Sequence, residues 1–227
     1  MRHALLILLL SIAAAPAAAQ GDVEYLAEIG GGAGLMNYMG DYNGALFHSP
    51  QPMATAFVRR LFNPYTGLRF GIGAGKLKDS SKGVETYYPA TADSIYSFSS
   101  TVIDGNLTFE YNFWPYGTGR DYRGAQRLTP FLVIGLGATY AKTGDKNTFT
   151  ANLPVGVGVK YKIADRMNLG VEWGVHFTLS DEIDGVKDPY YIESSGLFKN
   201  TDCYSALRVT FTYSFMAKCR TCHNADE

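Results

Sequence analysis

Outside its first residues, the sequence lacks any uninterrupted apolar run of about eighteen residues, the length that a membrane-spanning helix needs. Cysteine is scarce, with 3 copies among 227 residues, too few for the disulfide scaffold of a small secreted protein. Neither sign of charge is in excess, since the formal net charge is -1 and charged residues make up 18% of the chain. A chain without a basic surplus has no electrostatic attraction to nucleic acid, so we set nucleic-acid binding aside.

Glycine and tyrosine, by contrast, are plentiful, with 25 and 16 copies. This mixture suits tightly packed strands with interfacial aromatic side chains better than it suits the surface of a soluble enzyme. A positive start, a short apolar run and small residues at 17–19 predict a secretory signal peptide over residues 1–19. The remainder is long enough for one all-β domain, which we expect over 20–216, followed by a periplasmic tail at 217–227.

The clearest structural signal is a strict alternation over residues 167–180. Large apolar side chains occupy every second position, from Met167 through Trp173 to Leu179, and small, polar or charged residues lie between them. A period of two is typical of a β-strand with two unlike faces. At a tilt of about 45°, this strand would reach roughly 33 Å, enough to cross an outer membrane.

The same alternation predicts seven further strands. Three are as clear as the first, at 103–113, 152–163 and 206–215, and four are apolar or glycine-rich segments bounded by turn residues, at 24–36, 53–62, 66–77 and 128–141. The long polar connections would be 37–52, 78–98, 142–149 and 181–203, and the shorter turns 63–65, 114–127 and 164–166. We therefore expect an eight-stranded antiparallel transmembrane β-barrel of the outer membrane, with both termini in the periplasm.

A soluble barrel, such as a lipocalin-type binder, is the alternative, because its strands alternate as well. Such a protein would carry long Lys and Glu side chains on its outer polar face. Here the polar face is rich in Gly, Asn, Thr and Ser, which suits a cramped interior. We therefore favour the membrane barrel, with outer-membrane lipid around it.

An eight-stranded barrel is about wide enough only for its own side chains, so we expect a filled lumen and no open pore. The alternation directs charges of both signs inward, and buried charges are costly unless they are paired. This predicts a charge network across the lumen, with His176 as a member. Its acids would be Glu28, Asp104, Glu110 and Glu172, and its bases Arg69, Lys160, Lys162 and Arg208, joined by Arg59 or Arg60 according to the phase of their strand.

Glu172, His176 and Ser180 share one face of one strand, which raises the alternative of a barrel enzyme. Residues four positions apart on a strand are separated by about 13 Å, too far for a hydrogen-bonded relay. We therefore expect no catalytic residue, no enzymatic activity and no small-molecule substrate.

The tail contains the sequence Cys219-Arg220-Thr221-Cys222-His223. This is a haem c attachment pattern, a redox-type Cys-x-x-Cys, and three of the four ligands of a zinc site. A short tail offers little to shield a haem, so we expect no cofactor or metal, and favour a structural or intermolecular disulfide in the oxidising periplasm. Cys203 would lie about 30 Å away at the other end of the last strand, too far to pair with Cys219 or Cys222.

Residues 34–41, 147–154 and 195–198, and the tail through 219–223, resemble a Bacteroidetes outer-membrane barrel family that includes PorG, a component of the type IX secretion system. The likeness runs over essentially the whole chain after the signal peptide and is specific in the loops and tail. It implies a small barrel above a periplasmic ring of the lipoprotein PorK and its partner PorN, needed for protein secretion and, in some relatives, for gliding motility. No catalytic or cofactor residues carry over from the family.

A ring partner would meet the periplasmic turns and the tail. The turn at 114–127 is longer than a barrel needs, which either a docking role or a tolerated insertion would explain. The candidate partner or disulfide residues are Trp114, Arg120, Asp121, Cys219 and Cys222. The alternative function is a small OmpA- or OmpX-like barrel that acts alone through its long extracellular loops, in outer-membrane stability or adhesion.

Overall fold

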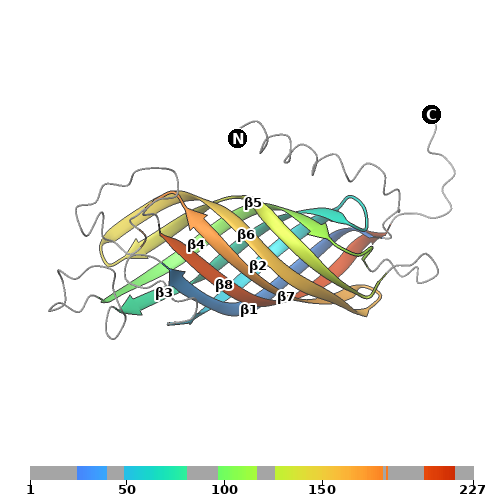
Figure 1. Cartoon of the computed structure of the whole chain (residues 1–227), viewed down its shortest axis with the longest axis horizontal. Helices are drawn as coiled ribbons and strands as arrows, with labels where there is room; N and C mark the ends of the chain where they lie inside the picture. The colour runs from blue at the N-terminus through green and yellow to red at the C-terminus, as the bar shows by residue number, and fades with distance from the viewer. Residues whose placement is uncertain are drawn as a thin grey trace, which may run out of the picture.

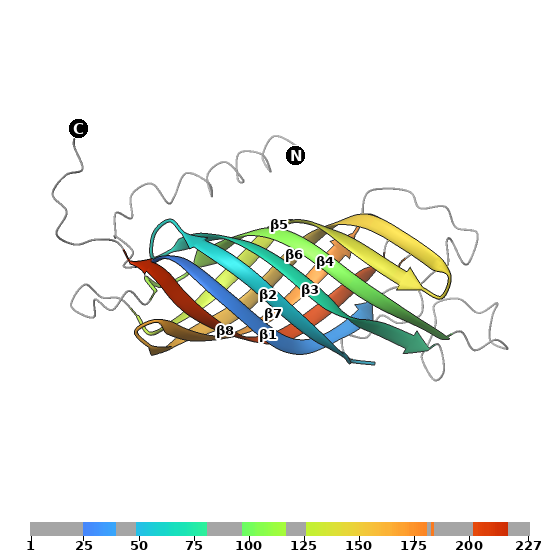
Figure 2. The same cartoon turned by 180° about the vertical axis from the view of Figure 1, so that it is seen from behind.

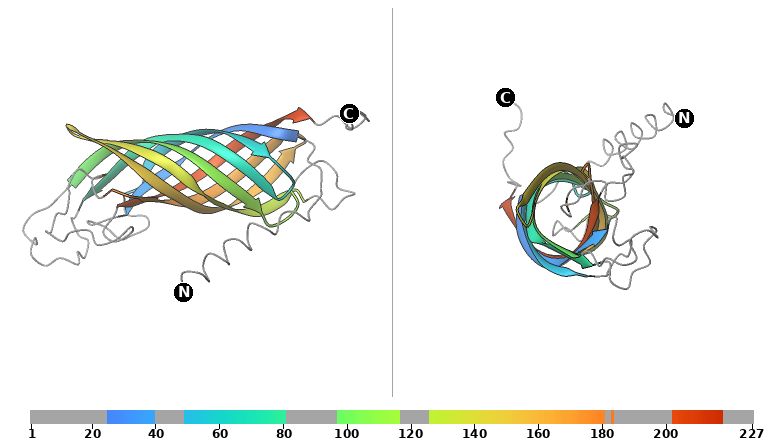
Figure 3. Two further views of the ribbon diagram at one scale, coloured as in Figure 1. Left: turned by 90° about the horizontal axis from the view of Figure 1, so that it is seen from above. Right: turned by 90° about the vertical axis from the view of Figure 1, so that its left-hand side faces the viewer.

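Eight antiparallel strands close into a barrel in the computed structural model, which describes residues 25–39, 49–80, 97–116, 126–180, 183 and 202–217. The strands are β1 (Tyr25–Met39), β2 (Gln51–Leu61), β3 (Thr66–Ser80), β4 (Ser97–Asn112), β5 (Leu128–Thr143), β6 (Lys146–Ala164), β7 (Met167–Thr178) and β8 (Cys203–Ala217). Each strand pairs with its neighbours in sequence, and β1 also pairs with β8 (Figures 1 and 2). Viewed along its axis, the sheet forms a ring (Figure 3). The predicted fold class is confirmed.

Within the described ranges, no helix is long and apolar enough to cross a membrane. Several predicted features lie outside the described residues: the signal peptide at 1–19, Arg120 and Asp121 of the 114–127 turn, and Cys219 and Cys222 of the tail.

All eight predicted strands are present, but the loop predicted at 142–149 is wrong. Strands β5 and β6 continue to Thr143 and from Lys146, so Gly144 and Asp145 form a two-residue turn. Gly144 has a φ of 59°, a backbone conformation that glycine adopts without steric cost. The outward residues Lys142 and Asn147 are polar although they pair across the hairpin. The apolar pattern therefore ends before the backbone pairing does, and for the same reason β4 begins at Ser97 and not at 103.

The two ends of the barrel differ in their connections. The end where β1 begins and β8 ends, here the short-turn end, carries the connections 62–65, 113–127 and 165–166. The opposite end, here the long-loop end, carries the connections 40–50, 81–96, 144–145 and 179–202.

The outer and inner faces of the barrel reverse the usual arrangement of a soluble protein. Large apolar side chains face outward and are exposed, such as Ile72 at 55%, Leu107 at 49% and Phe211 at 48%, whereas Glu110 inside is exposed by 1%. Along β4 and the residue that follows it, the outward apolar positions run from Ile103 to Phe113, about 23 Å along the axis at a tilt of about 45°. That height is close to the apolar band of roughly 25 Å that outer-membrane barrels present to lipid.

Candidate functional site

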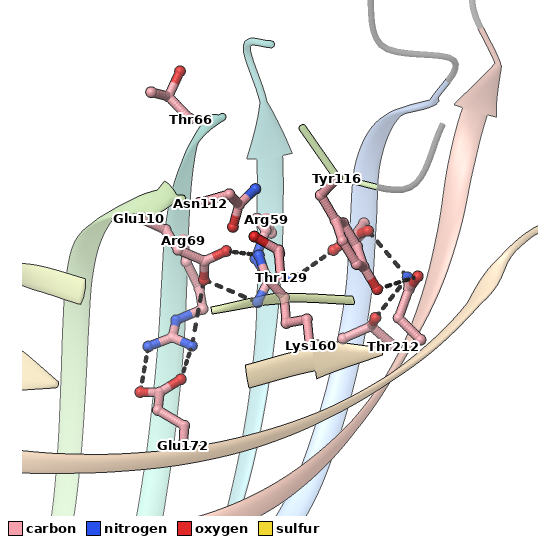
Figure 4. Close-up of polar contacts among 12 residues, drawn as sticks. Arg59, Thr66, Arg69, Glu110, Asn112, Tyr116, Thr129, Lys160, Glu172 and Thr212 are labelled. Atoms are coloured by element: carbon pink, nitrogen blue, oxygen red, sulfur yellow. Dashed lines mark hydrogen bonds and ion pairs between the residues drawn. The ribbon is translucent and has the colours of Figure 1, made fainter. Parts of the chain in front are cut away.

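The lumen holds a continuous chain of ion pairs at the centre of the barrel (Figure 4). It joins six of the residues predicted for the network, which are Glu28, Arg69, Glu110, Lys160, Glu172 and Arg208. Of the two candidate arginines on β2, Arg59 belongs to the network. Arg59 faces the lumen and is 3% exposed, whereas Arg60, the next residue on the strand, faces outward. Seven of the eight strands contribute a charged residue, so the network ties the wall together across the lumen.

Glu172 on β7 is held by two guanidinium groups. Arg69 donates to it through two hydrogen bonds, Nη1 to Oε2 at 2.5 Å and Nη2 to Oε1 at 2.9 Å. Arg208 donates from Nη2 to Oε1 at 2.6 Å. Such a paired arrangement fits the planar fork of arginine and compensates the desolvation of the buried carboxylate. Arg69 and Arg208 reach Glu172 from β3 and β8, so this carboxylate links opposite sides of the barrel.

Glu110 and Glu28 continue the network toward the short-turn end. Glu110 accepts a hydrogen bond from Lys160 and lies 3.0 Å from Nη2 of Arg59. The same guanidinium donates through Nη1 to Glu28. The ring of Phe57 lies 5.1 Å from the Cζ atom of Arg59, so a cation–π contact adds to the support of this group.

His176 and Asp104 form a second group, nearer the long-loop end. Nδ1 of His176 lies 3.6 Å from Oδ2 of Asp104, and its ring stacks on Tyr204 with centroids 4.6 Å apart. The hydroxyl of Tyr204 donates to Asp104 at 3.2 Å. Glu172 is engaged by arginines and His176 lies beside Asp104, so these two side chains do not form the relay that a barrel enzyme would need.

A small cavity of about 20 Å³ lies beside these two groups, and its lining includes Asp104, Asn106, His176 and Arg208. Each of the four has a buried polar atom with no hydrogen-bond partner in the described protein: Oδ1 of Asp104, Oδ1 of Asn106, Nδ1 of His176 and Nε of Arg208. A volume of that size suits about one water molecule, which satisfies such atoms in other protein interiors. The cavity is too small for an organic substrate.

Tyr116, from the connection between β4 and β5, closes the lumen at the short-turn end. Its side chain is 7% exposed, and its hydroxyl donates to Oδ1 of Asn168 at 2.9 Å. The ring lies 5.3 Å from Nζ of Lys160. Burial, reinforced by the carboxylate of Glu28, raises the pKa of the Tyr116 phenol above its ordinary value, so the hydroxyl keeps the proton that it donates.

An apolar plug closes the long-loop end. Met36, Tyr38, Leu77, Val102 and Ile183 meet inside the barrel, each exposed by 1% or less. Ile183 belongs to a connection, and its backbone N–H donates to Asp202 at 3.0 Å while its carbonyl accepts from Thr143 at 3.0 Å. Sequence reasoning missed both closures, because Tyr116 and Ile183 lie in connections, where alternation gives no signal.

Trp114 is the one predicted partner residue that the structure describes. It lies on the short-turn end with 46% of its side chain exposed, and its backbone N–H donates to Oγ1 of Thr129 at 3.1 Å. Elsewhere on this end the guanidinium of Arg166 donates to the hydroxyls of Tyr25 and Tyr213, each at 3.2 Å. The hydrogen bonds to Tyr213 and Tyr25 raise the pKa of Arg166 above its ordinary value.

Cys203 lies at the start of β8, on the long-loop end, as a half-buried free thiol that donates to the carbonyl of Met39 at 3.1 Å. The described part of the chain contains no group of three or more His, Cys, Asp or Glu side chains placed to hold a metal ion.

The model of one protein family, described as "Domain of unknown function (DUF6089)", matches residues 2–224. The chain belongs to this family. No curated protein matches this DUF6089 chain. Among solved structures, Neisserial surface protein A (NspA) is similar with a TM-score of 0.51 and 13% identity, over 83% of this chain and 97% of NspA.

Two further structures are similar to the DUF6089 chain at lower scores. Ail of Yersinia pestis, solved with the heparin analogue sucrose octasulfate, has a TM-score of 0.48 and 9% identity over 84% of this chain and 100% of its own. OprG, an outer membrane protein of Pseudomonas aeruginosa, has a TM-score of 0.48 and 13% identity over 87% of this chain and 99% of its own. The likeness to NspA shows the fold, which is that of the small outer-membrane barrels.

Proposed function

We propose that this DUF6089 protein is a non-enzymatic barrel of the outer membrane, closed to solutes, that anchors a periplasmic assembly. The observation that carries this proposal is the sealed lumen: ion pairs fill its centre, Tyr116 covers one mouth and Ile183 the other. In the part of the chain that the structure describes, side chains fill the lumen, and the cavity beside His176 is too small for an organic substrate, so the outer surfaces are left for function. An outer-membrane location is supported by the exposed apolar belt of about 23 Å and by the polar interior.

The assembly we propose is a type IX secretion system, in which the barrel has the role of PorG. The resemblance at 34–41, 147–154, 195–198 and in the tail supports this assignment. In that role both termini and the short-turn end face the periplasm, and the partners resemble PorK and PorN. Exposed Trp114 would contribute to the contact, since aromatic side chains are enriched at protein interfaces. The turn residues Arg120 and Asp121 and the tail residues Cys219 and Cys222 belong to the same proposed surface.

Affinity purification of the full chain from native membranes, without reductant, tests this role. We expect a periplasmic protein to co-purify with the wild type and to be lost, or reduced about tenfold, with Trp114→Ala or with the pair Cys219→Ser and Cys222→Ser. Phe149→Ala is the matched control, because Phe149 is an aromatic residue exposed by 75% toward the long-loop end. Retention of the partner by every variant would contradict docking at the short-turn end.

A stand-alone barrel of the OmpA or OmpX kind is the second candidate. It is favoured by the three long connections at the long-loop end, 40–50, 81–96 and 179–202, which would face the cell exterior. Deletion of the gene separates the two functions. Intact secretion together with increased sensitivity to detergent would support the stand-alone barrel, whereas a block in secretion would support the anchor.

A further inference from the structure

The charged residues of the barrel wall are sorted by sign. In the described strands, every acidic side chain is buried, and the exposed acids, Asp145 and Asp165, lie in turns. The exposed charges that the strands carry are all basic. At the long-loop end they include Lys76 and Lys78 on β3 and Lys142 on β5, whereas Arg60 is exposed near the short-turn end.

Strand register places the lysines immediately above the apolar belt. Ala74, Ile103 and Tyr140 lie side by side on β3, β4 and β5 and form the last apolar row. Two residues further toward the long-loop end, the corresponding row is Lys76, Thr101 and Lys142. The change from apolar to polar residues therefore follows one row of paired residues across three adjacent strands, with a lysine on two of them and a threonine on the third.

The three lysines form one patch, here the lysine patch, which consists of Lys76, Lys78 and Lys142 with the hydroxyl residues Ser99 and Thr101 between them. Neighbouring strands are about 4.8 Å apart, so the backbones of Lys76 and Lys142 are about 10 Å apart across Thr101. Lys78 follows Lys76 by about 7 Å along the same strand. Asp79 points inward and is 2% exposed, so among the described residues Asp145, three positions beyond Lys142 in the turn, is the exposed acid at this end.

We propose that the lysine patch binds the phosphate groups of a phosphorylated glycolipid, of the lipid A kind, in the outer leaflet. The inference rests on the proposed function, because it requires the long-loop end to face the cell exterior. Lipid phosphates lie just beyond the hydrocarbon edge, and the Lys76–Thr101–Lys142 row directly follows the last apolar row of these strands. Ammonium groups bind phosphate as point charges, and the threonine and serine hydroxyls add hydrogen-bond donors.

The apolar row below the patch would hold the acyl chains of the same lipid. Phe149 pairs with Tyr140 in register and is exposed by 75%, and Ile103 is exposed by 51%. A ligand with phosphates above and several acyl chains below would cover both rows at once. This favours a glycolipid of the outer leaflet over a soluble anion, which would use the lysines alone.

Native mass spectrometry of the purified full chain in detergent tests the assignment. The probes are lipid A with its phosphates, lipid A with its phosphates removed, inorganic phosphate and phosphatidylglycerol. We expect phosphorylated lipid A to bind the wild type and to bind Lys76→Gln/Lys142→Gln at least about tenfold more weakly, since each basic residue near an anionic lipid surface contributes on the order of a fivefold change. Arg60→Gln/Arg127→Gln is the matched control, because it removes two exposed charges at the short-turn end and should bind as the wild type does.

Equal binding of lipid A by Lys76→Gln/Lys142→Gln and the wild type would overturn the proposal. Equal binding of the dephosphorylated lipid, of inorganic phosphate or of phosphatidylglycerol would overturn it as well. A second pair, Lys78→Gln/Lys142→Gln, keeps the test decisive if the first fails to fold. This assay uses no periplasmic protein, so the two proposals can fail separately. If no periplasmic partner co-purifies but lipid A still binds, only the anchor role is contradicted. If the partner co-purifies but lipid A does not bind, only the lysine patch is contradicted.

Discussion

At the scale of single residues, the interior tolerates the carboxylates of Glu28, Glu110 and Glu172 because each has an arginine or lysine partner of opposite sign. Glu172 is the clearest case, since it accepts three hydrogen bonds from two arginines. Removing one member of a buried pair leaves an uncompensated charge, which destabilises a protein more than the pair itself stabilises it.

Glu172→Gln should therefore lower the free energy of unfolding by about 3–5 kcal/mol, because Arg69 and Arg208 would lose their counter-charge in the lumen. Urea titration in lipid vesicles, followed by the fluorescence of Trp114 and Trp173, measures the change. Asp165→Asn, in the exposed turn between β6 and β7, is the control and should alter stability by less than about 0.5 kcal/mol. Equal stability of the two variants would show that Glu172 is not a structural anchor.

Small residues in the interior make room for the charges, and Gly73 shows this most directly. A Cβ atom added to Gly73 would collide with the carboxylate of Asp104. Gly73→Ala should cost about 1–3 kcal/mol in the same titration, since overpacking displaces Asp104 from Tyr204. Gly105→Ala is matched to it, because a Cβ at Gly105 meets no atom within 4 Å. A cost shared by both variants would point to a general effect of glycine replacement and not to the space beside Asp104.

At the scale of elements, the strands are longer than the membrane belt that they cross. On β4 the outward apolar positions begin at 103, although the strand begins at Ser97. Backbone pairing continues because hydrogen bonding between strands does not depend on the side chains that face outward. Between β5 and β6 the pairing continues so far that only Gly144 and Asp145 remain in the connection.

Gly144→Val should destabilise this hairpin by about 1–2 kcal/mol, because a β-branched residue adopts a φ of 59° only with steric strain. Hydrogen exchange of the amides near Thr143 and Lys146 would report the local opening. Asp145→Ala, at a position without positive φ, should leave the exchange rates nearly unchanged. If Asp145→Ala opens the hairpin and Gly144→Val does not, the turn is held by the Asp145 side chain and not by glycine.

At the scale of the whole molecule, the lumen is closed at three levels: Tyr116, the ion-pair network and the plug around Ile183. The three levels come from different parts of the chain, and Tyr116 contacts the network through Lys160. Opening one of them should leave the other two in place.

We therefore expect no conductance steps comparable to those of a general porin when the protein is inserted into a planar lipid bilayer. Tyr116→Ala and Ile183→Ala should each behave as the wild type does, because the salt bridges between Arg69, Glu172 and Arg208 still fill the centre. A general porin recorded under the same conditions is the positive control. Stable porin-like steps from the wild type would contradict the closed interior and, with it, the observation behind the proposed function.

Alternation along the sequence determined most of the fold. A period of two sorts side chains onto two faces whatever their tertiary partners, so strands such as 167–180 could be recognised, and Glu28, Asp104 and Lys160 could be assigned to the interior from phase alone. The sequence did not decide which of Arg59 and Arg60 faces the lumen, because the two adjacent residues are both basic. The burial of Arg59 in the structure decides it.

Only the tertiary structure decided how those residues combine. Which carboxylate meets which base depends on the closure of β1 onto β8, and no local pattern encodes that closure: Glu172 meets Arg69 across 103 positions of sequence. Tyr116 and Ile183 enter the lumen from connections, where side-chain direction follows the path of the chain and not a period. The lysine patch likewise depends on register, since Lys76 and Lys142 are 66 residues apart and become neighbours of Thr101 only when three strands align. The sequence by itself determined what faces inward and outward, because that follows from backbone geometry, whereas contact across the lumen and between strands required the closed barrel.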